Sequence, residues 1–312
     1  MIRPPFPRAI NNSLLKAFRA CPRKAELEFI HHWKPGTDSV HLHAGKAYAN
    51  GLEAARRAYY ERGMASDDAI ALGGAALLEY YGDFECPAKI AKTPARMLGA
   101  LEFYFDNYPL ESDPCAPYEF APGKRAIEFS FATPMRIAHP TTGEPLIYAG
   151  RSDMIVTMAG GLFVEDDKTA SSLGESWINS FDMAAQFTGY CWSARQAGLA
   201  VDGVLIRGVS ILKTKYETLP VISYRKDWEI DRWLVQTERD ILRLIEMWKT
   251  GAYDYNLDAS CEAYGGCVFK RVCMSSDPEP WLEGYYTRRR RDSLDLTEVN
   301  ITPEEVESWE RV

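Results

Sequence analysis

The stretch from Gly150 to Lys168 reads GRSDMIVTMAGGLFVEDDK, and it decides the fold of this chain. Two runs rich in β-forming residues, Leu146 to Met158 and Leu162 to Lys168, flank a turn at Ala159-Gly160-Gly161. A Gly-Gly turn between apolar runs is a typical signal of a β-hairpin. Each run also carries a carboxylate where a purely structural strand would have none, so the hairpin is the first place to look for a functional site.

Parity along the hairpin indicates which of its charged side chains lie together. Side chains alternate faces along a strand, and cross-strand partners share a face. A two-residue loop sets Asp153 opposite Asp166 or Lys168, and either register puts these three side chains on one face. Asp167 then points to the other face. A three-residue loop would reverse this choice.

The shared face of the hairpin has a candidate chemistry. Two carboxylates within roughly 5–8 Å across a strand pair repel each other unless a cation lies between them. Mg²⁺ prefers such oxygen ligands, and a lysine beside them can position or deprotonate a water molecule. The sequence therefore favours a metal site at Asp153, Asp166 and Lys168, with a solvated hairpin edge carrying ordinary surface charges as the alternative.

The composition is typical of a globular protein. The chain has 312 residues, 46% of them hydrophobic and 26% charged, which is enough for one large domain or two modest ones. It has no run of about 18 apolar residues, and its first ten residues lack the apolar core of a signal peptide. We therefore expect no membrane span and a cytoplasmic location, where a disulfide framework built from the seven cysteines would be unusual.

Charge is unevenly distributed along the chain. The net charge of −8 argues against general attraction to nucleic acid but allows a local basic groove. Residues 1–25 contain six basic and no acidic residues, and Arg288 to Arg291 is a run of four arginines. For this run we expect a solvated flexible stretch, with guidance of a phosphate backbone as the alternative. An acidic tail follows, in which Thr302-Pro303 is typical of a helix start.

The order of the predicted elements indicates an α/β fold with a mixed sheet flanked by helices. Besides the hairpin, we expect strands at 125–137, 203–212 and 219–224, and helices at 11–32 (broken at Cys21-Pro22), 44–62, 67–81, 94–108, 182–197 and 227–250. We predict a single domain over residues 1–312, divided into an N-terminal helical part (1–123), a catalytic core (124–225), a C-terminal helix with the cysteine segment (226–280) and a basic, then acidic tail (281–312).

Two of these elements carry further candidate residues. Glu128 interrupts an apolar strand, where a carboxylate is either paired with a cation or a ligand. Gln186 and Tyr190 are four residues apart and share a face of the helix after the hairpin. For this pair alone, a tyrosine packed on the sheet beside a surface glutamine is the simpler structure.

Three of the cysteines lie close together near the C-terminus. Cys261, Cys267 and Cys273 are separated by five residues each, with Gly265-Gly266 allowing a tight turn between them. A metal or cluster needs four ligands as a rule, and Cys21 is the candidate for the fourth. The alternatives are an iron–sulfur cluster, tetrathiolate zinc and no metal, and the spacing lacks the paired CxxC knuckles usual for zinc.

Six short motifs occur in order along residues 13–273. They are CPRKA at Cys21, IEFSF at Glu128, GRSDMI at Asp153, DDKTA at Asp166, QFTGY at Gln186 and the triple-cysteine segment. As an ordered set they resemble the PD-(D/E)XK nuclease superfamily, specifically its RecB-like branch with an iron–sulfur cluster. That branch includes AddB-type nuclease domains, CRISPR-associated RecB-like exonucleases and related phage exonucleases. No single motif is specific, so the resemblance rests on the set.

The resemblance implies a restriction-endonuclease-like core and a role for each residue of the hairpin. Asp153 and Asp166 would bind Mg²⁺ or Mn²⁺ with help from the carbonyl group of Asp167. Lys168 would orient the attacking water and stabilise charge, and Glu128 would be a further ligand or would brace the lysine.

The resemblance also implies roles outside the hairpin. Gln186 and Tyr190 would correspond to a QxxxY motif that contacts DNA or supports the site. A [4Fe–4S] cluster, with zinc as the alternative, would be held by Cys21, Cys261, Cys267 and Cys273.

One departure from the family pattern concerns a metal-binding histidine. Many relatives have it in a helical G-x-A-x-H motif, whereas GKAYA here places Ala49 at that position. His43 lies close in sequence but out of register. Either His43 is a substitute ligand, or one metal site is weaker, or the protein uses one principal metal.

The function that the resemblance implies is metal-dependent hydrolysis of DNA. We expect an exonuclease that acts on single-stranded DNA or on free ends in recombination or repair, with a recombination or CRISPR-type protein as the kind of partner implied. A non-catalytic DNA-binding or complex-assembly module that keeps the fold is the alternative. A zinc-stapled hydrolase of another phosphoester is a third hypothesis.

Overall fold

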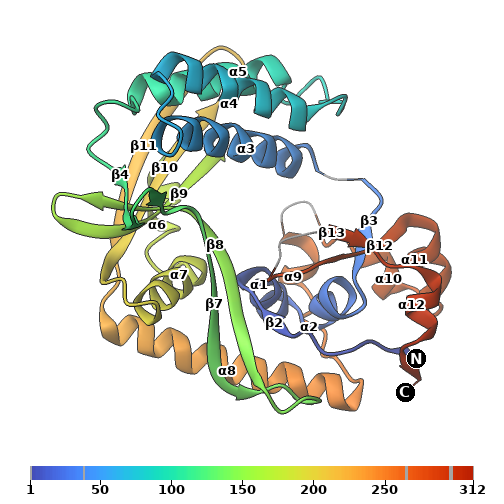
Figure 1. Cartoon of the computed structure of the whole chain (residues 1–312). Helices are drawn as coiled ribbons and strands as arrows, with labels where there is room; N and C mark the ends of the chain where they lie inside the picture. The colour runs from blue at the N-terminus through green and yellow to red at the C-terminus, as the bar shows by residue number, and fades with distance from the viewer. Residues whose placement is uncertain (1, 38, 264–265, 295–297, 312) are drawn as a thin grey trace. The chain divides into compact units, whose positions relative to one another are not determined.

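The computed structural model describes residues 2–37, 39–263, 266–294 and 298–311 (Figure 1). The chain divides into two compact units, each assembled from separate stretches. Unit 1 comprises Met1–Thr37, Phe131–Gly150 and Asp231–Val312, and unit 2 comprises Asp38–Ser130 and Arg151–Ile230. The predicted division of a single domain at residues 123, 225 and 280 stays a prediction. Among the described residues, no helix has the length and apolar character needed to cross a membrane.

A mixed β-sheet forms the centre of unit 2. From one edge inward its strands are β11 (Tyr216–Tyr224), β10 (Val201–Ile211), β9 (Gly161–Ala170) and β8 (Pro145–Met158). Strands β9 and β10 are parallel, whereas β8 pairs with β9 and β10 pairs with β11 in antiparallel fashion. Two further strands, β7 (Ile127–Ala138) and β4 (Ala116–Pro117), pair with β8, and a separate ribbon is formed by β5 (Glu119–Ala121) and β6 (Lys124–Arg125).

Helices cover both faces of this sheet (Figure 1). One face is covered by α3 (Val40–Tyr60), α4 (Ser66–Tyr81) and α5 (Pro94–Asn107), whose buried alanines, leucines and tyrosines pack together and against Val209 and Ile211 of β10. The other face carries α6 (Glu175–Asn179) and α7 (Ala185–Gln196). The predicted fold class, a mixed sheet flanked by helices, is therefore confirmed.

Helices α3 and α4 approach closely because glycines lie where they cross. A Cβ at Gly73 would lie 2.6 Å from the carbonyl oxygen of Gly51 and 2.8 Å from the Cβ of Ala55. Gly73→Ala is therefore expected to lower the free energy of unfolding by about 1–3 kcal/mol. Gly45→Ala, also helical but with nothing within 4 Å of the added methyl, is expected to raise it by about 0.5–1 kcal/mol. Urea unfolding measures both, and shifts of the same sign would contradict this packing.

The turn between β8 and β9 fixes the register of the hairpin. Met158 pairs with Gly161, so the loop has two residues, Ala159 and Gly160. Their φ angles are 50° and 84°, the left-handed conformation at both positions that suits a tight hairpin. The pairing ends at Met154 opposite Glu165, and the same register continued by one step would set Asp153 opposite Asp166. The loop is therefore the two-residue alternative, for which parity puts Asp153, Asp166 and Lys168 on one face.

Unit 1 contains the N-terminal helices, the cysteine segment and most of α8 (Asp227–Thr250). The first helix breaks as expected at Cys21-Pro22, giving α1 (Asn12–Ala20) and α2 (Pro22–Ala25), and a short π-helix at Glu26–Ile30 follows. A small core of Leu27, Trp33, Phe269, Val272 and Leu282 joins the N-terminal helices to the C-terminal elements. These elements are α9 (Ala259–Glu262), α10 (Lys270–Met274) and α11 (Glu279–Tyr285).

The arginine run differs from the prediction. It lies in β12 (Tyr286–Arg291), which pairs with β3 (Trp33–Pro35) and with β13 (Glu298–Asn300). The guanidinium of Arg288 lies 4.1 Å from the centre of the Trp33 ring, and Arg290 pairs with Glu305 at 2.6 Å. The expectation of a solvated flexible stretch is wrong because strand pairing and a tryptophan ring hold the arginines.

The acidic tail after the arginines is ordered in part. As predicted, a helix starts at Thr302-Pro303, where α12 (Pro303–Glu307) begins and the Thr302 side chain accepts a hydrogen bond from the backbone N–H of Glu305. Residues 295–297 of the tail lie outside the described residues.

Candidate functional site

Three charged side chains meet on one face of the hairpin, which we call the front face: Asp153 from β8, and Asp166 and Lys168 from β9. Asp166 is 3% exposed, and the Nζ atom of Lys168 contacts its Oδ2. Asp153 is oriented by a hydrogen bond in which its Oδ2 accepts from the backbone N–H of Asp167 at 2.7 Å. The hairpin thus brings two carboxylates and one ammonium group together in a partly buried setting.

The electrostatics of the front face are those of crowded anions. Burial raises the pKa of Asp153 well above its usual range, and the neighbouring Asp166 raises it further, whereas Lys168 lowers it. Burial also raises the pKa of Asp166, against the effect of Lys168. Two neighbouring carboxylates repel each other when both are ionised. A divalent cation would offset this repulsion more strongly than the single charge of Lys168 does.

Helix α7 places Gln186 and Tyr190 beside the front face. The Gln186 Nε2 donates to the Tyr190 hydroxyl at 3.1 Å, and Tyr190 is 9% exposed. Its hydroxyl pKa is raised first by burial and then by Asp166 and Asp153, so it lies within electrostatic range of both carboxylates. The same helix sets the Phe187 ring 5.9 Å from the Nζ of Lys168. The predicted pair therefore lies at the site.

Glu128 lies on β7 in an unusual backbone conformation, with φ at 51°. Its carboxylate is largely buried and pairs with Arg151 Nε at 2.6 Å. Burial raises the Glu128 pKa to about 7 despite Arg151, and Glu53 on α3 raises it as well. Glu128 in turn raises the pKa of Asp153, which places it in electrostatic range of the front face. The structure thus brings Glu128 near the predicted site as the partner of a cation.

His43 does not join these carboxylates. It lies near the start of α3, where its Nε2 is 2.9 Å from the carbonyl oxygen of Tyr81 and its ring stacks on Phe84 at 4.0 Å. The expectation that His43 replaces the family histidine is therefore not supported, because aromatic packing at the end of α4 engages the ring.

A buried charge network lies on the opposite side of β9, which we call the reverse face. Arg56 of α3 is 3% exposed and donates to Asp167 Oδ2 at 2.7 Å and to Glu165 Oε1 at 3.0 Å. It also donates to the Tyr104 hydroxyl at 2.6 Å. As parity predicts, the side chain of Asp167 points away from the front face, so only its carbonyl group is left for the predicted metal role.

A second arginine completes the reverse-face network. Arg207 of β10 makes two hydrogen bonds to the carboxylate of Asp113, at 2.5 and 2.8 Å, and its guanidinium lies 4.1 Å from the centre of the Tyr108 ring. Burial raises the pKa of Glu165 to about 7, although Arg207 and Arg56 lower it. Sequence reasoning missed these residues. The sequence did contain a signal for this network: three consecutive acids in one strand. Because side chains alternate along a strand, Glu165 and Asp167 lie on the side opposite Asp166, where buried carboxylates need cationic partners.

A divalent cation suits the front face, although the described residues include no group of three or more His, Cys, Asp or Glu side chains arranged as a complete ligand set. Mg²⁺ is commonly held by one or two carboxylates, with water and substrate phosphates completing the shell. Asp153 and Asp166 are two hard oxygen donors with raised pKa values, and a cation between them would relieve both. The residues present therefore fit such an ion.

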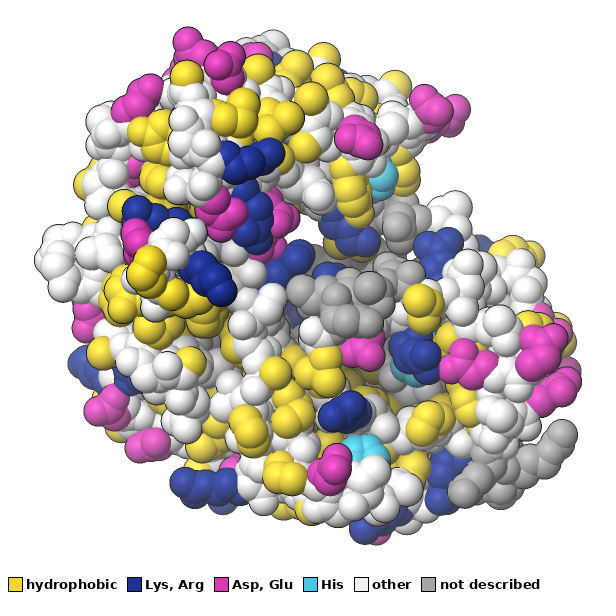
Figure 2. Space-filling view, in the orientation of Figure 1, with side chains coloured by type: hydrophobic (Ala, Val, Ile, Leu, Met, Phe, Trp, Pro, Cys, Tyr) yellow, Lys and Arg dark blue, Asp and Glu magenta, His cyan; other side chains and the backbone are white. Residues whose placement is uncertain are grey.

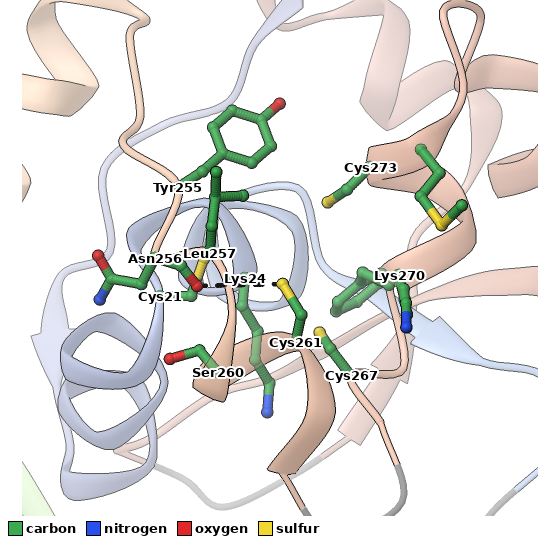
Figure 3. Close-up of a pocket in the computed structure, with 12 residues that line it drawn as sticks. Cys21, Lys24, Tyr255, Asn256, Leu257, Ser260, Cys261, Cys267, Lys270 and Cys273 are labelled. Atoms are coloured by element: carbon green, nitrogen blue, oxygen red, sulfur yellow. Dashed lines mark hydrogen bonds between the residues drawn. The ribbon is translucent and has the colours of Figure 1, made fainter.

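The four predicted cysteine ligands line one cavity of about 150 Å³ in unit 1 (Figure 3). Cys21 lies between α1 and α2, Cys261 is on α9 and Cys273 is on α10, with Cys267 between them. Hydrogen bonds connect the region of Cys21 to the C-terminal segment: the Arg23 N–H donates to Asp254 O at 3.0 Å, and the Ser260 hydroxyl donates to Ala20 O at 2.7 Å.

The surroundings of this cavity act on its thiols in both directions. The pKa of the Cys273 thiol is raised by burial and by the thiols of Cys267, Cys21 and Cys261, whereas Arg23 lowers it. Lys24 and Lys270 also line the cavity. Within the described part of the chain the four thiols are not arranged as a complete set of metal ligands. Their number and type are those of a cluster or ion with four sulfur ligands. The Gly265 of the predicted turn lies outside the described residues.

Lys and Arg side chains are interspersed with Asp and Glu over the face drawn in Figure 2. This face therefore carries charges of both signs.

Comparisons with known proteins give a fold-level likeness only. No family model matches the chain, and no curated protein matches it. It is similar to a crystal structure of a protein from Eubacterium rectale that is provisionally named an exonuclease, with a TM-score of 0.48 and 15% identity over 86% of this chain and 90% of that chain. The structure of SSO0001 is similar with a TM-score of 0.31 and 15% identity, over 72% and 84% of the two chains. Function must therefore be argued from the side chains.

Proposed function

We propose that this protein is a Mg²⁺- or Mn²⁺-dependent DNA nuclease that hydrolyses phosphodiester bonds. The observation that carries the proposal is the front face: the hairpin register brings Asp153 and Asp166 together, with Lys168 in contact with Asp166. This is the arrangement expected of the PD-(D/E)XK nucleases that the sequence resembles.

Asp153 and Asp166 would hold the cation, with the carbonyl group of Asp167 as a further oxygen donor. When bound, the cation polarises a phosphate oxygen and lowers the pKa of a bound water. Asp153 is held ready for this role because the N–H of Asp167 donates to its Oδ2. Glu128 would be a further ligand or would brace the lysine, and in the structure the cation that its carboxylate pairs with is Arg151.

Lys168 would act as a hydrogen-bond donor. Burial lowers its pKa, but Asp166 and Asp153 raise it, so that the pKa lies above its ordinary value. A charged ammonium group orients the attacking water by donation and stabilises negative charge on the phosphate. The Tyr190 hydroxyl, held by Gln186, would support the carboxylates from α7.

The substrate class in the proposal is DNA with single-stranded character or free ends, cleaved as an exonuclease in recombination or repair. Support comes from the ordered motifs of the sequence. The four cysteines would hold a [4Fe–4S] cluster that joins the N-terminal helices to residues 254–273, a structural role first. Thiolate ligands suit zinc as well, so metal analysis distinguishes the two.

The proposal is tested with end-labelled single-stranded and double-stranded DNA and the full-length protein. Degradation is expected with Mn²⁺ or Mg²⁺, with complete loss in excess EDTA and recovery when Mn²⁺ is restored. Labels at the 5′ and 3′ ends report the polarity and separate exonuclease from endonuclease products. Binding of DNA without hydrolysis under all metal conditions would overturn the proposal in favour of a non-catalytic DNA-binding module.

A further inference from the structure

We infer that Arg56 is a positioning residue for the metal site, acting from the reverse face of β9 without touching metal or substrate. The inference rests on the proposed function and goes beyond it, because it assigns the affinity of the site for its cation to a helix outside the hairpin. Arg56 lies on α3, about 110 residues before the strand that it clamps.

The geometry is a clamp behind the strand. Arg56 donates to Glu165 and to Asp167, the two residues that flank Asp166 and point away from the front face. The β9 backbone is paired with β10 through Ala170, and Arg56 adds a tether from α3 to the side chains on either side of Asp166. One of these neighbours, Asp167, donates its backbone N–H to Asp153 Oδ2 at 2.7 Å. One guanidinium therefore connects α3 to the strand segment that carries Asp166 and orients Asp153.

Few other groups can replace this clamp. Asp167 Oδ1 is buried and has no hydrogen-bond partner within the described part of the chain, so its ion pair with Arg56 is what orients this side chain. Arg56 itself is held by the Tyr104 hydroxyl, which also accepts a hydrogen bond from Arg207 at 3.2 Å. The fork of a guanidinium reaches two carboxylates and a hydroxyl at once, which an ammonium group cannot do.

The test measures Mn²⁺ binding to the purified full-length protein by calorimetry, and DNA hydrolysis separately. Arg56→Lys keeps the charge and loses the fork, so Mn²⁺ is expected to bind about tenfold more weakly, within the range found for residues behind metal ligands. At saturating Mn²⁺, kcat is expected to fall by a similar factor, while KM for DNA stays within twofold because Arg56 is buried. Tyr104→Phe is expected to give a smaller loss in the same direction.

Two controls separate positioning from a general loss of stability. Gly203→Ala weakens the packing of β10 on β11, where the added Cβ would lie 2.4 Å from the carbonyl oxygen of Ser223, and leaves the partners of Arg56 unchanged. Arg62→Lys makes the same change as Arg56→Lys at an exposed arginine two residues after α3. Both are expected to bind Mn²⁺ as the wild type does. Equal weakening in Gly203→Ala and Arg56→Lys would overturn the inference.

The outcomes also distinguish the inference from the function on which it rests. If the wild type binds Mn²⁺, Asp166→Asn abolishes binding and Arg56→Lys binds normally, the inference fails and the proposed function stands. If the wild type binds no Mn²⁺ and cleaves no DNA, both fail. A selective loss in Arg56→Lys supports both.

Discussion

Asp166→Asn is expected to lower the rate of metal-dependent DNA hydrolysis about a thousandfold or more, equivalent to about 4 kcal/mol of lost transition-state stabilisation. The substitution keeps the size of the side chain and removes the charge that would hold the cation. Asp166 is buried and contacts Lys168, so the amide also removes an ion pair. Burial raises its carboxyl pKa, which means that the folded state disfavours the ionised form, so the neutral amide is expected to stay folded.

Lys168→Met gives the complementary result. It removes the donor while leaving both carboxylates, so Mn²⁺ binding is expected to persist while hydrolysis falls by about two to three orders of magnitude. Glu217→Gln is the matched acid-to-amide control for Asp166→Asn. Glu217 is an exposed acid on β11, and its ion-pair partner is the exposed Lys215. Wild-type rates in both Asp166→Asn and Lys168→Met would show that the front face is not the catalytic centre.

Cys21→Ser is expected to have the second-largest effect, on the metal content and stability of unit 1. In the proposed cluster Cys21 would be the ligand that connects the N-terminal helices to the residues after 254, so its loss would leave three thiols for a four-ligand group. Since metal binding at a structural site is also folding free energy, we expect loss of absorbance near 400 nm, a wavelength characteristic of such clusters in the proposed family. The midpoint of thermal unfolding is expected to fall by on the order of 10 °C.

The control for Cys21→Ser is Cys86→Ser. Cys86 is a partly exposed cysteine of unit 2 whose thiol contacts the carbonyl oxygens of Pro87 and Ile90. Absorbance and iron content should match the wild type in this variant. Full iron content in Cys21→Ser would exclude Cys21 as a ligand, and zinc in the wild type would replace the cluster with the alternative metal.

The hairpin could be predicted because residues close together in the sequence specify it. The turn residues set the loop length, and alternation then decides which of Glu165, Asp166 and Asp167 faces Asp153. Helix α8 was predicted over the same residues that it occupies, 227–250, because its amphipathic pattern has clear ends. Both elements are specified by residues that are neighbours in the sequence.

The reverse-face network could not be predicted because each partner is ambiguous by itself. Arg56 on an amphipathic helix is most often a solvated charge, and Asp113 lies in a proline-rich segment that reads as a connector. Tertiary packing makes these residues buried partners: α3 places Arg56 against Asp167, and β10 places Arg207 against Asp113. The arginine run was misjudged for the same reason, since β12 pairs with residues about 250 positions earlier.

The residue ranges that make up the two units also set the order in which the units can form during synthesis. All of unit 2 has been made when residue 230 leaves the ribosome, whereas Cys21 must wait for Cys273, about 250 residues later. At about 5–20 residues per second, that delay is roughly 10–50 s. Until Cys261 has been made, the Cys21 thiol has none of its three partners. Loading of the proposed cluster would therefore follow synthesis of Cys273, so a shortage of iron–sulfur donors or an oxidant would act on a chain whose hairpin is already made.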